Sequence, residues 1–358
     1  MTVFHALARL GIEGLVVVEP DQQFLCLGFF DDAKQVVDFD FCAAENIPVM
    51  RRELGGGLVL LGPGQIFYQL VIKRGDPRLP VPIADAYRKF SQAPLRAYKR
   101  LGVEVSYRPV NDIVTAQGRK ISGQGAADID RCFVFVGNIL CEFNVKLWSR
   151  SMKVCDERFR AKLANTMEQN LSWLARELEE VPKPGSIASL IQEEFASILG
   201  PFEKKELPAD VWKLADELAE ELTSKEIIFM ETSRRHSMIK VKEGTYLRCG
   251  VYETPKGRVL AEVEIDEGRI KKVVLALDAT ISPKYLLRSL SMKLRGVKFD
   301  FHSVAERLKK VMRSDQARCR GMRPEELAFA IVGERNGHYG KIRCNPRLSG
   351  PSLPHAGA

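Results

Sequence analysis

The sequence lacks several patterns that would assign it to a known class directly. It has no C-x-x-C pair or other spacing typical of metal ligands, and no G-x-x-x-x-G-K-[ST] loop. Zinc-finger, helix-turn-helix and RNA-recognition signatures are missing, and so are internal repeats. These absences argue against a structural zinc module, a repeat protein and a P-loop phosphotransferase. We therefore expect that the protein binds no nucleic acid and that its own side chains form no metal site.

Targeting and membrane segments are also absent from the sequence. No apolar run approaches the roughly 20 residues that cross a bilayer, and the N-terminus is mixed rather than basic and then apolar. The eight cysteines are scattered along the chain: Cys26, Cys42, Cys132, Cys141, Cys155, Cys249, Cys319 and Cys344. This pattern predicts a cytoplasmic protein with free thiols and no membrane contact.

The bulk composition is that of a globular protein. A chain of 358 residues exceeds the size of one ordinary core and predicts two or three domains. Its residues are 45% hydrophobic and 28% charged. The net charge of +8 fits nucleic acid, a phosphate-rich small molecule, an acidic protein partner or merely a solvated surface.

Hydrophobic periodicity predicts an α+β fold, with a mixed β-sheet flanked by helices and a second, small α+β domain. We expect strands within 14–30, 65–73 and 103–143, helices over 36–45, 83–101, 156–178, 186–199 and 210–222, four strands between 238 and 277, then helices over 282–296 and 324–332. The predicted domains are 1–200 for catalysis, 201–235 as a helical connector, 236–311 as an accessory domain and 312–358 as a basic, partly disordered extension.

Three short elements carry the chemical information. Arg51-Arg52 precedes Gly55-Gly56-Gly57, where missing Cβ atoms let backbone N–H groups approach an anionic, acyl-bearing ligand while the arginines neutralise phosphate. Asn111-Asp112 and Lys120, which lies between Gly118 and Gly123, follow. A structural glycine turn, an Asx turn and a solvated hairpin turn are the alternative interpretations.

In order and separation, these elements resemble the motifs of the lipoate-protein ligases, whose superfamily includes biotin-protein ligases and octanoyl transferases. Residues 51–57 resemble Arg-Arg-x-x-Gly-Gly-Gly, 111–112 resemble Asn-Asp, and 118–123 resemble Gly-x-Lys-hydrophobic-x-Gly. The resemblance covers 14–225 and implies a biotin/lipoyl ligase-like catalytic domain. A looser resemblance relates residues 237–296 to the accessory domain of this family. A chain with altered motifs and a fused accessory domain is also similar to the dedicated lipoate ligases of sulfur oxidisers.

The chain departs from the family pattern at several positions. Leu54 and Leu61 replace a serine and a histidine, and Phe135-Val136-Gly137 replaces His-His-Gly. The segment 62–65, Gly-Pro-Gly-Gln, resembles octanoyl transferases, which use a cysteine nucleophile facing the lysine and need no ATP. Cys155 is the cysteine to consider for that role, although its surroundings resemble a ligase helix start and favour a structural thiol.

The resemblance implies ATP-dependent activation of lipoate to lipoyl-AMP, with Mg²⁺ screening the phosphates, followed by transfer to a lysine of a lipoyl-accepting protein. Lys120 is the implied catalytic residue. The implied substrate- and adenylate-binding residues are Arg51, Arg52, Gly55, Gly56, Gly57, Val59, Leu60, Asn111, Asp112, Ser122 and Gly123. Val59, Phe67 and Val114 are candidates for an apolar slot.

The implied acceptor is of the H-protein type or an acyltransferase lipoyl domain, and the positive charge would steer an acidic domain of this kind. Two alternatives stay open: an octanoyl or lipoyl transferase that works without ATP, and a non-catalytic protein that binds lipoyl domains. The Gly-Arg-Gly-Arg-x-Gly loop of biotin ligases is missing from the sequence.

Overall fold

The computed structural model describes residues 1–231, 238–254, 257–277, 281–282, 285–314, 318–319 and 323–333. The chain divides into two compact units, residues 1–249 with 263–271 and residues 250–262 with 272–358. The four domains proposed from the sequence stay a prediction. Within the described ranges, no helix is both long and apolar enough to cross a membrane.

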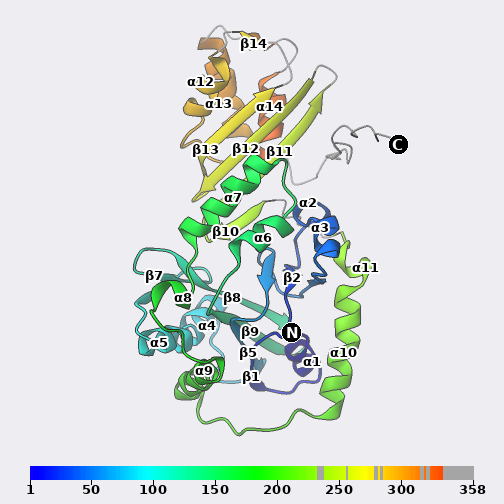
Figure 1. The fold of residues 1–358 in the computed structure, drawn as a ribbon, viewed down its shortest axis with the longest axis vertical. Coiled ribbons are helices and arrows are strands. Elements are labelled where there is room, and N and C mark those ends of the chain that lie inside the picture. Colours follow the sequence, from blue (N-terminus) through cyan, green and yellow to red (C-terminus); the bar gives the residue numbers. More distant parts are fainter. Residues whose placement is uncertain are drawn as a thin grey trace, which may run out of the picture. The chain divides into compact units, whose positions relative to one another are not determined.

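An antiparallel sheet lies at the centre of the first unit, with strand order β1-β5-β9-β8-β7-β6 (Figure 1). Its strands are β1 (Gly14–Val18), β5 (Gln65–Lys73), β6 (Val105–Arg108), β7 (Asp112–Thr115), β8 (Lys120–Ile129) and β9 (Cys132–Leu140). All residues of β5 except Lys73 are buried, as expected for a strand that is covered on both faces. The predicted α+β fold is confirmed.

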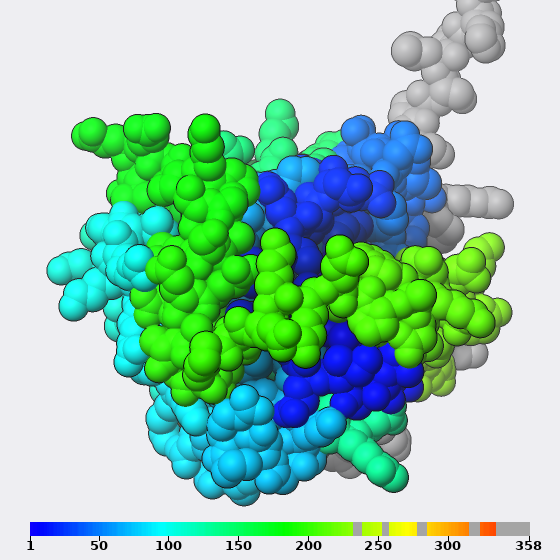
Figure 2. Space-filling model, turned by 90° about the horizontal axis from the view of Figure 1, so that it is seen from below, coloured from blue at the N-terminus to red at the C-terminus, as the bar shows by residue number. Residues whose placement is uncertain are grey.

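Helices cover both faces of this sheet. α4 (Ile83–Phe90), α5 (Gln92–Arg100) and α9 (Pro184–Leu199) pack in one hydrophobic cluster with β5 and β9. α1 (Val3–Arg9) and α10 (Ala209–Thr223) belong to a second cluster with other residues of the same strands. Figure 2 shows the segment between α9 and α10 crossing the molecule over N-terminal residues, which joins the helices of the two clusters.

The predicted single helix over 83–101 is two helices. Pro94 has no backbone N–H to donate to the carbonyl four residues earlier, so the chain interrupts the helix at Ser91. Ala86, Tyr87 and Phe90 of α4 are buried in the core, whereas Ala84 is exposed.

A smaller sheet of order β3-β2-β4 carries the glycine loop. β2 (Phe24–Leu27) pairs in parallel with β3 (Val49–Arg51) and antiparallel with β4 (Val59–Leu61). The loop from Arg52 to Leu58 therefore joins the two neighbours of β2. The remaining helices of the first unit are α2 (Ala33–Val36), α3 (Phe39–Ala44), α6 (Val145–Ser151), α7 (Glu157–Asn170), α8 (Leu174–Glu177) and α11 (Lys225–Ile228).

The four strands predicted between 238 and 277 are present, in order β10-β11-β12-β13. They are β10 (Ile239–Lys242), β11 (Thr245–Thr254), β12 (Gly257–Asp266) and β13 (Arg269–Leu277), followed by α12 (Leu286–Lys293), α13 (Phe301–Ser314), α14 (Pro324–Val332) and the short strands β14 (Ile281–Ser282) and β15 (Arg318–Cys319). The helix predicted at 324–332 is confirmed, whereas α13 was not predicted. The end predicted to be disordered lies mostly outside the described residues.

Candidate active site

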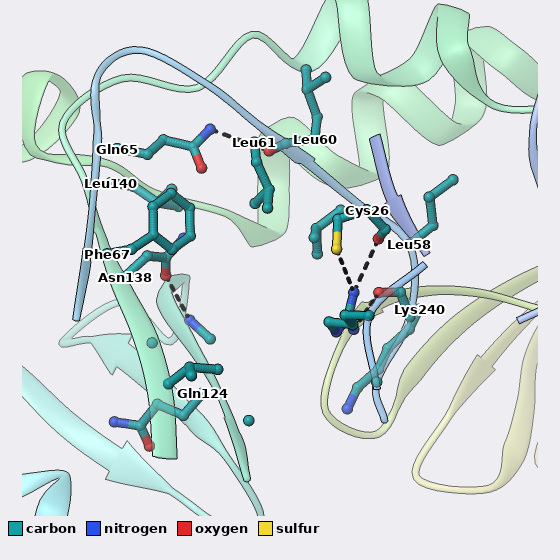
Figure 3. A pocket seen from close by; sticks show the side chains of 18 of the residues that line it. Cys26, Leu58, Leu60, Leu61, Gln65, Phe67, Gln124, Asn138, Leu140 and Lys240 are labelled. Atoms are coloured by element: carbon teal, nitrogen blue, oxygen red, sulfur yellow. Dashed lines mark hydrogen bonds between the residues drawn. The ribbon is translucent and has the colours of Figure 1, made fainter. Parts of the chain in front are cut away.

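A cavity of about 190 Å³ opens in the first unit between the glycine loop and strands β5, β8 and β9. Its polar lining includes Arg52, Asn111, Lys120, Gln124 and Lys240. Figure 3 shows Leu58, Leu60, Leu61, Phe67 and Leu140 around the same space. The cavity thus combines cationic groups with a large apolar surface, which suits a ligand that has an anionic and an apolar part.

Lys120 lies at the start of β8, with its side chain 20% exposed. Its Nζ is 2.8 Å from Oδ1 of Asp112, a side chain with no exposed surface. The backbone N–H of Glu243 donates to the other oxygen of Asp112 at 2.7 Å. Burial acts to raise the pKa of Asp112, but Lys120 and this N–H outweigh it and hold the pKa below its usual value. The carboxylate is therefore ionised and fixes the ammonium group at the cavity.

Gly123 leaves space for the lysine side chain. A Cβ at this position would lie 3.0 Å from both Cε and Nζ of Lys120. The N–H of Gly123 donates to Oδ1 of Asn138 at 3.3 Å, and Oγ of Ser122 donates to the carbonyl of Asn138 at 2.6 Å. Gly123 lines the cavity, whereas Ser122 is fully buried behind it. Ser122 thus positions strand β8 and does not reach the cavity.

The two arginines of the pair have different surroundings. Arg51 is 1% exposed and does not line the cavity. Its guanidinium donates to the carbonyls of Gly28, Phe29, Asp31, Ile227 and Ile228 at 2.5–3.0 Å. The guanidinium of Arg51 thus holds the 28–31 loop and α11 in place as a structural cation, and the contribution of Arg51 to adenylate binding stays a prediction.

Arg52 does line the cavity. Its Nη2 donates to the carbonyls of Gly55 and Gly57 at 2.8 and 2.9 Å, and its Nη1 donates to the carbonyl of Cys26 at 3.0 Å. Gly56 has a φ of +93°, a conformation that side chains rarely adopt. Arg52 and this glycine together shape the loop and bring positive charge to the cavity.

The other residues that the sequence predicted to bind substrate or adenylate lie at the cavity. Gly55, Gly56, Gly57, Val59, Leu60 and Asn111 all line the cavity. Nδ2 of Asn111 donates to the carbonyl of Gln124 at 2.6 Å, while its Oδ1 is buried without a partner among the described residues. Of the residues considered for an apolar slot, Val59 and Phe67 line the cavity and Val114 does not.

The departures from the family motifs fall on apolar sites. Leu61 and Val136 line the cavity, and Leu54 is 1% exposed beside it. A Cβ on Gly137 would lie 2.2 Å from the hydroxyl of Tyr68, so the tyrosine ring needs a glycine there. Apolar side chains at these positions make the cavity more suitable for a hydrocarbon chain than the family pattern suggests.

Several cavity residues were not predicted from the sequence. Lys240 comes from β10, and its Cβ lies 3.3 Å from the place of a Cβ on Gly57. Its Nζ is 2.6 Å from Oε2 of Glu243. His5 of α1, Cys26 of β2 and Gln124 of β8 also line the cavity. The alternation of Ile239 and Val241 with two lysines predicts a strand, but nothing local predicts what its lysines face.

Cysteine pairing corrects another prediction. Cys155 and Cys249 form a disulfide with a Cα–Cα distance of 6.2 Å, so they are not free thiols. Cys26, Cys42, Cys132 and Cys141 are free thiols, as predicted, and all four are buried. Cys155 does not line the cavity, and Cys26 is the cysteine that does so within the described part of the chain.

No group of three or more His, Cys, Asp or Glu side chains suited to a metal ion occurs in the described residues. The chemistry of the donors agrees with this finding around Lys120, because both oxygens of Asp112 already have partners. A divalent cation at this site would therefore depend on oxygens that the substrate brings, as magnesium often does with phosphates.

Lipoate ligases are among the solved structures with a similar fold. A bi-partite lipoate protein ligase from Thermoplasma acidophilum superposes with a TM-score of 0.57 at 20% identity, covering 64% of this chain and 92% of that one. A lipoate-protein ligase A bound with ATP gives a TM-score of 0.53 at 18% identity, covering 64% and 93%. At these identities the likeness defines the fold.

Sequence comparison adds the family. The chain belongs to the family of the lipoyl protein ligase A/B catalytic domain, whose model matches residues 4–196. It is 24% identical over 221 residues to octanoyltransferase LipM of Kyrpidia tusciae, covering 55% of this chain and 80% of that protein. It is 24% identical over 155 residues to lipoate-protein ligase A subunit 1 of Thermoplasma acidophilum, covering 41% of this chain and 58% of that relative's length. The family thus includes both ligases and octanoyl transferases.

Proposed function

We propose that this protein is an ATP-dependent lipoate-protein ligase. It activates lipoate to lipoyl-AMP and transfers the lipoyl group to a lysine of a lipoyl-accepting protein. The observation that carries this proposal is the ion pair of Lys120 with buried Asp112, placed at a cavity that also contains the glycine loop, Arg52 and an apolar wall. Family membership fits the same chemistry.

In the first step, a carboxylate oxygen of lipoate attacks the α-phosphorus of ATP, and the bond to pyrophosphate breaks. Negative charge builds on the phosphoryl oxygens in the transition state. The ammonium of Lys120 and the guanidinium of Arg52 stabilise this charge, and the fixed position of Lys120 avoids a reorganisation cost during the reaction. Fixed charges of this kind typically contribute a few kcal/mol.

In the second step, the amine of the acceptor lysine attacks the acyl carbon, the C–O bond to AMP breaks, and the nitrogen loses a proton. Lys120 stabilises the oxyanion of the tetrahedral intermediate. Magnesium arrives with ATP as part of the substrate. The unpartnered Oδ1 of Asn111 offers an acceptor for a donor group of the nucleotide or for a water bound to its magnesium.

An octanoyl transferase is the second candidate, supported by the similarity to octanoyltransferase LipM. That reaction needs a thiol that faces Lys120. Cys155 is bonded to Cys249 and lies off the cavity. Cys26 lines the cavity, but its Sγ is 3.7 Å from Nη1 of Arg52 and it extends from the strand beside the glycine loop. The bond between Cys155 and Cys249 removes the cysteine that the sequence suggested, so we take the ligase as the first candidate and Cys26 as the thiol that a transferase would use.

Mass spectrometry of a lipoyl-accepting apoprotein distinguishes the candidates. The apoprotein is incubated with this protein, Mg²⁺ and lipoate, with and without ATP, and in parallel with octanoyl carrier protein alone. We expect a gain of one lipoyl group that requires ATP. Modification from the carrier protein without ATP, together with a thioester on Cys26, would instead establish the transferase.

A second assay, pyrophosphate exchange, tests whether this protein only binds lipoyl domains without catalysis. A ligase returns labelled pyrophosphate to ATP when the acid is present, whereas a binding protein does not. Acidic lipoyl domains and H-proteins are the acceptors to test first, because the net charge of +8 favours encounter with an acidic surface. Relation to the ligases of sulfur oxidisers stays a prediction.

A further inference from the structure

Lys240 is a cation at the cavity that the proposed reaction does not use. It lies on β10, outside the part of the chain that matches the family model, and it lines the cavity together with Arg52 and Lys120. Figure 3 shows Lys240 on the side of the pocket where Cys26 and Leu58 lie. The family motifs therefore say nothing about what this lysine binds.

The third glycine of the loop gives Lys240 its space. Gly55 has no heavy atom within 4 Å of a Cβ built on it, and Gly56 has a φ of +93°. Gly57 does not have a positive φ, yet Cβ of Lys240 lies 3.3 Å from the place of its Cβ. This distance is shorter than the 3.4–4 Å of ordinary van der Waals contact, so a side chain at position 57 would displace β10. The glycine loop and β10 are thus fitted to each other.

Contacts on both sides of Lys240 hold β10 at the cavity. Ile239 and Val241 are buried in one hydrophobic cluster with Leu58 of the glycine loop. At the turn that follows, the backbone N–H of Glu243 donates at 2.7 Å to the buried carboxylate that also pairs with the catalytic lysine. The backbone that carries Lys240 is therefore fixed relative to the glycine loop.

The charges that face the cavity are positive. Arg52, Lys120 and Lys240 line it, and no carboxylate does so within the described ranges. Nζ of Lys240 lies 2.6 Å from Oε2 of Glu243, a side chain that is 25% exposed. Although burial acts to raise the pKa of Asp112, the charge of Lys240 joins that of Lys120 in lowering it. A partly exposed ion pair such as Lys240–Glu243 is weak, so an anion with several charges can replace the carboxylate.

We propose that Lys240 is a further substrate-binding residue, whose ammonium binds a phosphate group of the nucleotide beside the glycine loop. This inference rests on the proposed function, in which ATP enters this cavity. On binding, Nζ exchanges the carboxylate of Glu243 for phosphate oxygens, which accept charge-assisted hydrogen bonds. A lysine suits this exchange because its ammonium is a compact point charge on a flexible stem.

Equilibrium binding of MgATP tests the proposal without catalysis. Calorimetry on the full chain gives the dissociation constant of MgATP without lipoate and, in a second series, that of lipoate without nucleotide. Lys240→Met keeps a long side chain beside Gly57 and removes the charge. We expect its dissociation constant for MgATP to rise about tenfold or more, because a charge-assisted hydrogen bond is lost. Its affinity for lipoate should change by less than about twofold.

Lys242→Met is the matched control. Lys242 lies on the same strand and its charge also acts on Asp112, but it does not line the cavity. Its Nζ donates to the carbonyl of Gly118 at 3.3 Å. The control should keep its affinity for MgATP within about twofold of wild type. Lys240→Arg preserves the charge and should keep most of the affinity.

Glu243→Gln supplies a test of opposite sign. The substitution removes the carboxylate that competes for Nζ of Lys240, and it leaves the backbone N–H that donates to Asp112 unchanged. MgATP should therefore bind about threefold more tightly. If the Lys240–Glu243 pair served only to hold the hairpin together, both Lys240→Met and Glu243→Gln would weaken binding.

The outcomes separate this inference from the proposed function. Wild-type MgATP affinity in Lys240→Met, or a wild-type protein that does not bind MgATP, would overturn the role of Lys240. A loss of lipoate affinity in place of MgATP affinity would also reject it, since the cation would then bind the acid.

MgATP binding that depends on Lys240, in a protein that returns no labelled pyrophosphate to ATP, would support the inference and reject the ligase. If Lys240→Met fails to fold, Glu243→Gln still decides the question, because an unchanged or weaker affinity for MgATP in that variant contradicts the exchange of partners.

Discussion

Nζ of Lys120 lies 2.8 Å from Oδ1 of Asp112, and the carboxylate of Asp112 is completely buried. The lysine is therefore a proposed catalytic cation and also the partner that compensates a buried charge. A substitution at either position affects stability as well as chemistry, because an unpaired buried charge is strongly unfavourable.

Lys120→Ala should lose at least about 100-fold in the rate of lipoyl-AMP formation, because the charge that stabilises the transition state is gone. It should also lower the free energy of unfolding by roughly 1–3 kcal/mol, since Asp112 loses its partner. Pyrophosphate exchange and urea unfolding measure the two effects. The fraction of folded protein in each assay is checked by circular dichroism.

The double variant Lys120→Ala/Asp112→Asn separates the two roles. Removing the carboxylate charge should restore most of the lost stability, whereas exchange activity should stay absent. Recovery of activity in the double variant would show that Lys120 acts only by neutralising Asp112, and the proposed catalytic role would then be wrong.

Arg51 and Arg52 should respond differently to the same substitution. Arg51→Met leaves carbonyls of the 28–31 loop and α11 without donors, so we expect a loss of at least about 3 kcal/mol in stability. Its kcat/KM per folded molecule should change little. Arg52→Met should instead lower kcat/KM for lipoate adenylation by 10-fold or more. Equal kinetic defects in the two variants would contradict this division.

The different roles of the two arginines follow from strand geometry. Successive side chains of a strand point to opposite faces, so a pair at the end of β3 cannot place both side chains in one cavity. The motif located Arg52, Lys120 and the glycine loop because each is a local pattern. Period-two alternation would have indicated that only one arginine faces the ligand, but the sequence does not say which one.

Other parts of the site depend on contacts that are distant in sequence. His5 reaches its partner Glu53 across 48 residues, and Glu243 reaches Asp112 across 131. No local pattern encodes such pairs. Cys155 and Cys249, separated by 94 residues, are of the same kind, and the scattered spacing that predicted free thiols carries no information on distance in space. Helices and strands were easier to predict because their periodicity is local.

The Cys155–Cys249 disulfide should stabilise the oxidised protein. It closes a loop of 94 residues, for which loss of chain entropy in the unfolded state contributes at most roughly 4–5 kcal/mol. Cys155→Ser/Cys249→Ser should lower the melting temperature without reductant and match the wild type when reductant is present. A wild-type melting temperature that does not respond to reductant would contradict the pairing. Adenylation by the variant at a temperature where it is folded should stay near the wild-type rate.

The raised pKa of Asp31 should make the free energy of unfolding depend on pH. Burial raises the pKa of this carboxyl to about 6, against the opposing charges of Arg52 and Arg51. The folded state thus binds a proton more strongly than the unfolded state, whose pKa is near 3.8. Stability from this group is present below pH 4 and is lost as pH rises through 6. At pH 8 the buried carboxylate destabilises the fold by up to roughly 3 kcal/mol.

Asp31→Asn should therefore raise the free energy of unfolding at pH 8 by roughly 1–3 kcal/mol. Its oxygen can still accept the hydrogen bond that Gly28 N–H donates to Asp31 at 2.8 Å. The gain should shrink toward pH 4.5, where the wild-type carboxyl is protonated. Urea unfolding at both pH values measures the difference, and a gain that is equal at the two values would rule out titration of Asp31 as the cause.

Gly28 offers a test of the glycine loop from outside the cavity. A Cβ on Gly28 would lie 1.9 Å from the carbonyl oxygen of Gly56 and 2.8 Å from its carbonyl carbon. These are backbone atoms, so the contact cannot be relieved by turning a side chain. Gly28→Ala must displace the loop that Arg52 holds around Gly55 and Gly57, and we expect a loss of more than 10-fold in kcat/KM for lipoate with roughly 1–3 kcal/mol of stability.

Gly14→Ala is the matched control, because no heavy atom lies within 4 Å of a Cβ built on Gly14. This glycine belongs to β1 of the same unit and does not have a positive φ, so alanine fits there without backbone strain. The control should stay within about 0.5 kcal/mol of wild type and keep its kinetics. If Gly28→Ala behaved like this control, the conformation of the loop would not matter for activity. The glycines would then serve only as a turn, which is the alternative that their sequence left open.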